Sequence, residues 1–333
     1  GAGYIGSHTL LMLLREQHEV LVFDNYLNGS PMALQRVQQL AGTGFQVCEG
    51  DVRNAARLND IFSGFRPEAV IHFAGLKAVA ESIGIPLDYY SQNVGGSIEL
   101  LRAMQRHDCP RIVFSSSASV YGDAEYLPYD EDHRLKPTSP YGRTKYFTEE
   151  IIRDWVASTS GASAVLLRYF NPVGAHASGM IGEDPRSTPS NLFPYIARVA
   201  VGRLASLTVF GDDYDTRDGT CERDFIHVED LARAHLAAIE FVSGRRGCEA
   251  FNVGTGLGAT VLEIVDAFAK SSGREIPYSI SPRREGDVAR SVAGVNKAER
   301  LLGWKAKYGI VDMCESAWRW QSGNPFGYSD RGQ

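Results

Sequence analysis

The sequence predicts an α/β protein with a doubly wound parallel sheet. Two observations carry this prediction: strand-like apolar runs alternate with amphipathic stretches through the first half of the chain, and a glycine turn leads straight into an apolar helix near residue 1. In open sheets of this type, ligands bind beyond the carboxyl ends of the strands. The expected strands, in order, are VLVFD, FQVCEGD, AVIHFAG, RIVFSSS and AVLLRYF.

The ends of these five strands carry the informative residues. Asp24, Asp51, Gly75, Ser117 and Phe170 each stand at or beside a carboxyl end. Five such placements are hard to attribute to packing. We therefore expect a binding site along this edge of the sheet.

The segment GAGYIGSHTLLMLL predicts a dinucleotide-binding turn of the Rossmann type. Gly3 and Gly6 let the backbone approach a pyrophosphate at a helix N-terminus, and Asp24 stands about where an acid would accept hydrogen bonds from the adenosine ribose. Glycine turns also serve plain packing, but the acid at the strand end favours a cofactor. Asp24 would repel a 2′-phosphate and neither Asn25 nor Tyr26 supplies a cation, so we expect NAD rather than NADP. The strand that normally precedes this turn is not in the sequence before Gly1, and we expect a truncated sequence rather than a fold without its central strand.

Tyr141 and Lys145, in SPYGRTKYFTEE, are candidate catalytic residues. Four residues apart, they project from one face of the helix expected there. A nearby cation favours the phenolate, so Lys145 should lower the pKa of Tyr141 and make it a base near neutral pH. Ser117 could relay or hold the substrate proton. The pair alone is weak evidence, because this spacing also arises by chance.

Composition excludes several classes of protein. The chain has 333 residues, a net charge of −6 and no basic cluster, which argues against a nucleic-acid partner. No apolar run approaches the roughly 20 residues that span a bilayer, so no membrane partner is expected. Five scattered cysteines and eight dispersed histidines predict a reducing, cytoplasmic compartment and no metal site.

The domain organisation is expected to be interleaved. Residues 1–170 should form the NAD-binding domain, and 224–255, with a helical pattern followed by AFNVG, should return to it. After Phe170 the pattern loosens into long polar loops, which are usually functional in compact domains. Residues 171–223 and 256–333 are expected to form a smaller substrate-binding domain.

Seven motifs resemble, in order and spacing, those of the UDP-glucose 4-epimerases of the extended short-chain dehydrogenase/reductase superfamily. The first and fourth are shared across that superfamily, whereas the RYFNPVGAH, DGT and RREGD segments are closer to the epimerases. The resemblance covers essentially the whole chain. The motifs are GAGYIGSH, VIHFAGLKAV, FSSSASVYGD, SPYGRTK, LLRYFNPVGAH, DGTCERDFIHVEDLA and PRREGD.

The resemblance implies roles for particular residues. Tyr141 is the base, Lys145 lowers its pKa and holds the nicotinamide ribose, and Ser117 bonds the reacting sugar oxygen. The residues implied in NAD binding are Gly3, Tyr4, Ile5, Gly6, Asp24, Asn25, Asp51, Val52, Phe73, Ala74, Gly75, Lys77, Ser115, Tyr141, Lys145 and Phe170. Those implied in UDP-sugar binding are Lys77, Ser117, Tyr141, Asn171, Asn191, Leu192, Phe210, Arg223, Arg284, Asp287 and Ser291.

The reaction implied is inversion at C4 of a UDP-hexose through a transient 4-keto sugar. Tyr141 removes the 4-OH proton as C4 gives its hydride to NAD⁺, and the keto sugar then turns over and takes the hydride back on its other face. The arginines 223 and 284 must therefore grip the diphosphate while the hexose stays free to rotate. NAD should stay bound throughout the cycle.

Three positions depart from the family pattern. Gln92 replaces an asparagine, which puts a cofactor contact there in doubt, and Glu222 replaces a residue that is usually apolar. Ser291 stands where relatives restricted to plain hexoses carry a bulky tyrosine. Its small side chain predicts that UDP-GlcNAc and UDP-GalNAc are also substrates.

Other functions stay open at this point. A UDP-pentose 4-epimerase would look very similar, and a sugar-nucleotide dehydratase or decarboxylase would share the scaffold. Elimination needs an acid where Ala118 and Ser119 stand here, which argues against those two. A non-catalytic NAD-binding regulator is also conceivable on this fold, although Ser117, Tyr141 and Lys145 are all present. The resemblance further implies a homodimer, with helices 86–107 and 140–158 as the expected interface.

Overall fold

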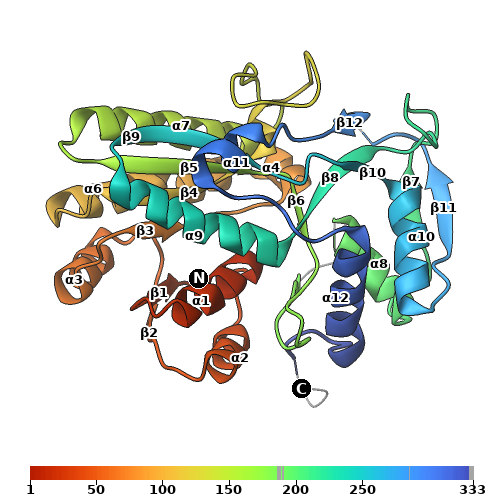
Figure 1. Cartoon of the computed structure of the whole chain (residues 1–333), viewed down its shortest axis with the longest axis horizontal. Coiled ribbons are helices and arrows are strands. Elements are labelled where there is room, and N and C mark those ends of the chain that lie inside the picture. The colour runs from red at the N-terminus through yellow and green to blue at the C-terminus, as the bar shows by residue number, and fades with distance from the viewer. Residues whose placement is uncertain (186–188, 190, 285, 330–333) are drawn as a thin grey trace.

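A computed structural model describes residues 1–185, 189, 191–284 and 286–329, and it confirms the α/β class (Figure 1). Four parallel strands form the main sheet in the order β3-β4-β5-β9, and two further parallel strands pair as β1-β2. All five strands expected in the first half are present. The bounds are β1 (Leu21–Asp24), β2 (Gln46–Glu49), β3 (Val70–His72), β4 (Arg111–Ser117), β5 (Ser163–Tyr169) and β9 (Gly247–Val253).

Helices cover both faces of the main sheet, because successive side chains of a strand point to opposite faces. On β4, Ile112 and Phe114 pack with α3, α6 and α7, whereas Val113 packs with α9 and α11. Figure 1 shows α7 and α9 on opposite sides of the sheet. The helical segments of this part are α1 (Tyr4–Arg15), α2 (Pro31–Ala41), α3 (Ala55–Phe65), α4 (Val79–Gly84), α5 (Pro86–Tyr89), η1 (Tyr90–Gly95), α6 (Gly96–Arg106), η2 (Ala118–Val120), α7 (Pro140–Ser158), α9 (Val228–Gly244) and α11 (Asn296–Leu302).

The helix expected over 86–107 is not uniform. It consists of α5, the π-helical turn η1 and α6 in succession. The helix expected over 140–158 is α7, which has those bounds. Local sequence explains where α7 begins: Ser139 caps it by accepting from the Gly142 N–H, and Pro140 occupies its first turn, where no donor is lost.

The remaining strands and helices pack beside the carboxyl edge of the main sheet. Strand β8 pairs with β6, β10 and β12, and β7 pairs with β11. Helices α8, α10 and α12 share an apolar core with these strands. The bounds are β6 (Asn171–Val173), α8 (Leu192–Ala200), β7 (Leu207–Phe210), β8 (Glu222–His227), β10 (Gly258–Thr260), α10 (Val261–Ser272), β11 (Tyr278–Ser281), β12 (Arg290–Ser291) and α12 (Ile310–Gly323).

The chain crosses between the two parts several times. Strand β9 extends the main sheet beside β5, and α9 packs on α1. Strand β8 spans the expected boundary at residue 224 and pairs only with strands of the second part. Helix α11 packs on β9 and α9, so a piece of 256–333 belongs to the core of the first part. No helix among the residues described is long and apolar enough to cross a membrane.

Candidate active site

A cavity of about 1860 Å³ is lined by the whole of β1 and β3 and reaches the carboxyl ends of β4 and β5. Its walls come from the glycine turn before α1, the loop after β3, the start of α7, and segments of the second part. Almost every residue predicted to bind or react lines this cavity. The exceptions among the described residues are Asp51 and Ser291.

The turn before α1 can hold a phosphate. Gly3 is the N-cap of α1, and a Cβ added there would meet no heavy atom within 4 Å, so its backbone faces open space. Gly6 is different, because a Cβ there would lie 2.7 Å from the Gly1 carbonyl oxygen. The first turn of α1 therefore presents N–H groups to the cavity, as pyrophosphate binding requires. The Tyr4 hydroxyl donates to the Gly174 carbonyl at 2.6 Å and ties the turn to the loop after β6.

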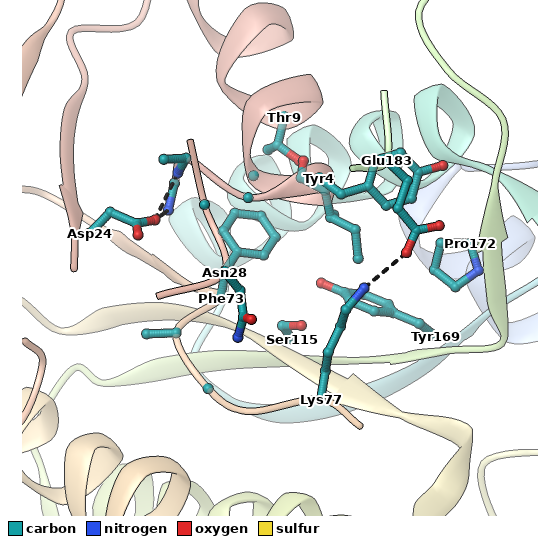
Figure 2. Close-up of a pocket in the computed structure, with 18 of the residues that line it drawn as sticks. Tyr4, Thr9, Asp24, Asn28, Phe73, Lys77, Ser115, Tyr169, Pro172 and Glu183 are labelled. Atoms are coloured by element: carbon teal, nitrogen blue, oxygen red, sulfur yellow. Dashed lines mark hydrogen bonds and ion pairs between the residues drawn. The ribbon is translucent and has the colours of Figure 1, made fainter. Parts of the chain in front are cut away.

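Asp24 is oriented toward this turn (Figure 2). Its carboxylate accepts from the Ala2 N–H at 2.8 Å and the Tyr26 N–H at 2.9 Å. Asp51 is arranged otherwise: hydrogen bonds from Arg53 lower its pKa to about 2. The same carboxylate accepts from the Asn25 amide at 3.2 Å. Asp51 therefore faces Arg53 at the rim rather than the cavity.

The loop after β3, residues 73–77, is held by an asparagine of the π-helical turn. The Asn93 amide oxygen accepts from the Leu76 N–H at 2.7 Å, and its nitrogen donates to the Leu76 carbonyl at 3.0 Å. The same nitrogen donates to the Thr144 hydroxyl at 3.0 Å. Asn93 thus connects the cofactor loop to the helix that carries Tyr141. Gln92, doubtful from the sequence, is buried and lines the cavity.

Helix α7 brings Tyr141 and Lys145 to the cavity. Its approach to the sheet depends on Gly142, where a Cβ would lie 2.6 Å from the Ser119 carbonyl oxygen. The Lys145 ammonium donates to the Ser115 carbonyl at 2.8 Å and lies 5.9 Å from the centre of the Tyr141 ring. Burial lowers the pKa of Lys145 to about 8, and the charge of Glu149 acts against this.

The ionisation of Tyr141 differs from the sequence-based expectation. Burial raises the pKa of Tyr141 above its ordinary value, while a hydrogen bond with Ser117 and the charge of Lys77 act in the opposite direction. The role expected of Lys145 in lowering the pKa of Tyr141 stays a prediction: the Lys145 ammonium bonds the Ser115 carbonyl, and Lys77 is a second cation that acts on Tyr141. The Ser117 hydroxyl also donates to the Ser119 hydroxyl at 3.2 Å.

Lys77 is held by an acid that the sequence did not single out. Its ammonium donates to Glu183 at 3.0 Å, across the cavity from the loop after β6 (Figure 2). The charge of Glu183 raises the pKa of Lys77 above its ordinary value. Lys77 therefore stays cationic where it can act on Tyr141.

A second phenol, Tyr169, lines the same cavity. Its hydroxyl hydrogen-bonds His235, and burial raises the pKa of Tyr169 well above its ordinary value. Burial also lowers the pKa of His235 to about 4, which leaves this imidazole neutral near pH 7. Tyr169 therefore stays protonated, and Tyr141 is the better placed base of the two.

The far end of the cavity is cationic. Arg284 and Arg223 flank Asp287, with Arg284 nitrogens 3.0 and 3.1 Å from its carboxylate oxygens and Arg223 at 3.7 Å. The Arg284 guanidinium lies over the Phe210 ring, 5.4 Å from its centre. The further predicted residues lining this end are Asn171, Asn191 and Leu192.

Two of the doubtful positions lie close to Arg223. Glu222 is buried, and its carboxylate pairs with Arg217 at 3.0 Å and Arg290 at 3.4 Å, whereas its backbone carbonyl accepts from the Arg223 guanidinium at 3.0 Å. Ser291 on β12 is paired with Arg223 on β8 in the parallel register, outside the cavity lining. The role expected of Ser291 beside the sugar stays a prediction.

Sequence reasoning missed four residues of the site: Asn93, Ser119, Tyr169 and Glu183. Asn93 left a signal, since two adjacent amides interrupt a helical pattern in QNVGG. Glu183 lies in a loop more than 100 residues from Lys77, so no local pattern could have paired them. Within the described chain, no group of three or more His, Cys, Asp or Glu side chains could hold a metal ion.

Comparisons with known proteins agree with this geometry. Residues 1–254 match the model of the NAD dependent epimerase/dehydratase family. The mouse (Mus musculus) UDP-glucose 4-epimerase is 51% identical over 335 residues, covering 98% of this chain and 96% of the mouse protein. A bifunctional UDP-glucose 4-epimerase and UDP-xylose 4-epimerase of Pisum sativum is 50% identical, covering 99% and 96%.

A solved structure is also similar over nearly the full length. It is the UDP-glucose 4-epimerase of Bifidobacterium longum in complex with NAD⁺ and UDP, with a TM-score of 0.95, 48% identity and 98% of each chain covered. Fold, cavity and sequence relationship all point the same way: this chain belongs to the NAD-dependent epimerase/dehydratase family, among the UDP-glucose 4-epimerases.

Proposed function

We propose that this protein is an NAD-dependent isomerase that interconverts UDP-glucose and UDP-galactose by inverting C4. The observation that carries the proposal is a single cavity that joins three parts: the glycine turn, the Ser117–Tyr141–Lys145 cluster and the Arg223–Arg284 end. The order of these parts matches the order of cofactor, reacting carbon and nucleotide in such a reaction. The B. longum relative, solved with NAD⁺ and UDP, supports the same assignment.

The residues that would hold NAD fit its chemistry. Open backbone at Gly3 and the first turn of α1 suit the pyrophosphate, and Asp24 suits the adenosine ribose hydroxyls. Asn25, Val52 and the loop 73–77, with Ser115 and Phe170, would line the rest. When bound, the nicotinamide supplies a hydride acceptor and donor.

Residues of this chain would remove the proton of the sugar 4-OH and return it. We assign Tyr141 as the base that takes the 4-OH proton and later returns it, with Ser117 bonding the same oxygen. Lys77 and Lys145 are the cations that favour its ionised form.

The nucleotide would be gripped at the cationic end. Arg223 and Arg284 suit a diphosphate, since guanidinium groups bind phosphate oxygens in pairs. Asp287 would hold the uridine ribose, with Asn171, Asn191, Leu192 and Phe210 around the nucleotide. The hexose would keep few strong contacts and so could turn over.

We also propose that N-acetylated hexoses are accepted. Ser291 is small and adjoins Arg223. Because Arg223 lines the cavity and Ser291 lies beside it, the small Ser291 side chain would leave space next to the sugar that a tyrosine would fill. Conversion of UDP-GalNAc would support this proposal. A protein that converts UDP-galactose well and does not convert UDP-GalNAc would contradict it.

A UDP-pentose 4-epimerase is the second candidate. The observation that favours it is the P. sativum relative, whose name includes both hexose and xylose activities. Elimination or decarboxylation is not favoured, because Ala118 and Ser119 offer no acid beside Tyr141. A non-catalytic regulator would not require Ser117, Tyr141 and Lys145 together in the cavity.

We propose a homodimer that pairs through α5–α6 and α7. Large apolar side chains stand exposed on this side: Ile83 at 68%, Leu87 at 80% and Phe147 at 43%. Burial of such a patch against a second copy would stabilise the dimer.

We further propose a cytoplasmic location, supported by all five cysteines being free thiols. Residues 171–227 and 256–329, apart from α11, would form the nucleotide-sugar part, with the interruptions of the described residues.

The deciding experiment is an assay of the purified protein with UDP-galactose, UDP-GalNAc and UDP-xylose, without added cofactor and then with NAD. Each product is identified as the C4 epimer. Tyr141→Phe should lose roughly 10²–10⁴-fold in turnover, as removal of a general base does, while the protein stays folded. If the Phe variant turns over at the parent rate, the proposal is wrong.

A further inference from the structure

A fully buried ion pair lies directly beneath the candidate active site. The Arg168 guanidinium on β5 donates to both carboxylate oxygens of Glu149 on α7, at 2.7 and 3.0 Å. The two side chains are 1% and 0% exposed. The Ser116 hydroxyl on β4 donates to the same carboxylate at 2.5 Å. Neither Glu149 nor Arg168 touches the cavity.

Glu149 is one of a series of α7 side chains that contact β4. Tyr141, Lys145 and Glu149 follow at intervals of four and therefore share one face of α7. Two of them contact consecutive serines of β4: the Lys145 ammonium donates to the Ser115 carbonyl, and the Glu149 carboxylate accepts from the Ser116 hydroxyl. Rotation or sliding of α7 would break both contacts together.

The surroundings of the Lys145 ammonium show what Glu149 adds. Lys145 is 6% exposed, and its ammonium lies 5.0 Å from the Phe114 ring centre. Two groups offset the loss of hydration of this buried ammonium. The Ser115 carbonyl accepts a hydrogen bond from it, and the negative charge of Glu149 acts against the lowering of the Lys145 pKa by burial. The titratable or charged groups around Lys145 and Glu149 are Tyr141 and Arg153 on α7, His72 on β3, Arg168 on β5 and Tyr121 after η2.

A gain in folding stability does not by itself explain why the protein buries the Glu149–Arg168 ion pair. Two charges removed from water lose hydration that their attraction only partly restores, so an apolar pair of equal volume is often as stable. A negative charge at this place has a further effect that an apolar pair would lack: it favours the cationic form of the lysine one helical turn away.

We propose that Glu149 is a positioning residue for the reaction, which supplies the counter-charge of Lys145 and, with Arg168 and Ser116, sets the register of α7 on β4. The inference deepens the proposed function and rests on it for its kinetic test only.

The first measurement does not depend on turnover. Competitive labelling with acetic anhydride at a series of pH values, read by peptide mass spectrometry, gives the midpoint at which Lys145 becomes a nucleophile. In Glu149→Gln the midpoint should fall by about one pH unit or more, because a nearby opposite charge shifts a pKa by that amount. Glu150→Gln is the matched control: it removes the same charge from the next residue, which is 49% exposed, and should leave the midpoint in place.

The second measurement is the pH profile of UDP-galactose conversion. The alkaline limb of Glu149→Gln should move to lower pH by the same interval, while a purely structural defect would lower the rate at every pH. Where Glu149→Gln does not fold because Arg168 is left unpaired, Glu149→Gln/Arg168→Met removes both buried charges. The Lys145 midpoint should then fall by less than in the single variant and still lie below that of the parent, because the lost carboxylate stands one helical turn from Lys145 whereas Arg168 lies on β5.

The two measurements separate the possible failures. An unchanged Lys145 midpoint in a folded variant overturns the positioning role. A shifted midpoint in a protein without epimerase activity supports the counter-charge and rejects the proposed function instead. A shifted midpoint with a shifted alkaline limb supports both.

Discussion

The Lys77 ammonium lies 3.0 Å from a Glu183 carboxylate oxygen, although 106 residues separate the two in the chain. The pair spans the cavity from the loop after β3 to the loop after β6 (Figure 2). The charge of Lys77 acts to lower the pKa of Tyr141. The reactivity of Tyr141 therefore depends on an acid outside the Tyr–Lys motif.

Replacing Glu183 with glutamine should make Tyr141 more acidic. The change removes a negative charge and leaves Lys77 uncompensated, and both effects favour the phenolate. Because the ionised form is the active base, the rise of the rate with pH should occur about half to one pH unit lower. The measurement is kcat against pH with UDP-galactose. Lys77→Gln should shift the rise the opposite way, and equal shifts in the two variants would contradict this electrostatic account.

Gly142→Ala should damage both stability and turnover. A Cβ at this position would lie 2.6 Å from the Ser119 carbonyl, so α7 or η2 must move. We expect a loss of about 1–3 kcal/mol in the free energy of unfolding, as overpacking usually costs, together with a lower kcat. Gly64→Ala is the control: it is also helical, has nothing within 4 Å of its added Cβ, and should stabilise α3 by about 0.5–1 kcal/mol. Denaturant titration of both variants decides the matter.

Arg284→Met should weaken substrate binding more than chemistry. The guanidinium is implied in gripping the diphosphate, which stays fixed while the hexose turns, so its loss should raise KM about tenfold or more with a smaller change in kcat. Arg283→Met is a close control, since the Arg283 side chain pairs instead with Asp213 at 2.7 Å. Similar KM values for both variants would argue against a diphosphate contact at Arg284.

Acid should destabilise the fold from about pH 6.5 downward. Burial lowers the pKa of His8 and His72 to about 3 and that of His227 and His235 to about 4. Since the unfolded chain binds protons at these residues near pH 6.5 and the folded chain does not, their contribution is fully present above that pH. Each should cost about 1.4 kcal/mol per pH unit below it until its folded pKa is reached.

Urea titrations at pH 7 and pH 5 test this dependence. His235→Gln should reduce the pH dependence by one histidine's share. A pH dependence that is identical in this variant and in the parent would show that His235 is not the group responsible.

Much of the fold could be predicted from local pattern. The strands of the first half follow from apolar runs between turns, and α7 from a capping serine, a proline and a regular helical period. The pattern did not reveal the π-helical turn at Tyr90–Gly95, because its sequence stays compatible with a continuous helix. The adjacent amides of QNVGG mark Asn93 as unusual, but its role depends on the contact of that turn with Leu76 and Thr144, which the sequence does not show.

The sequence by itself determined the fold class, the glycine turn, the acid at Asp24 and the Tyr141–Lys145 spacing, because each depends on residues near one another in the chain. Tertiary structure alone decided which charges surround the phenol. Glu183 reaches Lys77 and Arg168 reaches Glu149 only because distant segments pack together. An ionisation equilibrium responds to distance in space and to burial, and neither can be read from spacing along the chain.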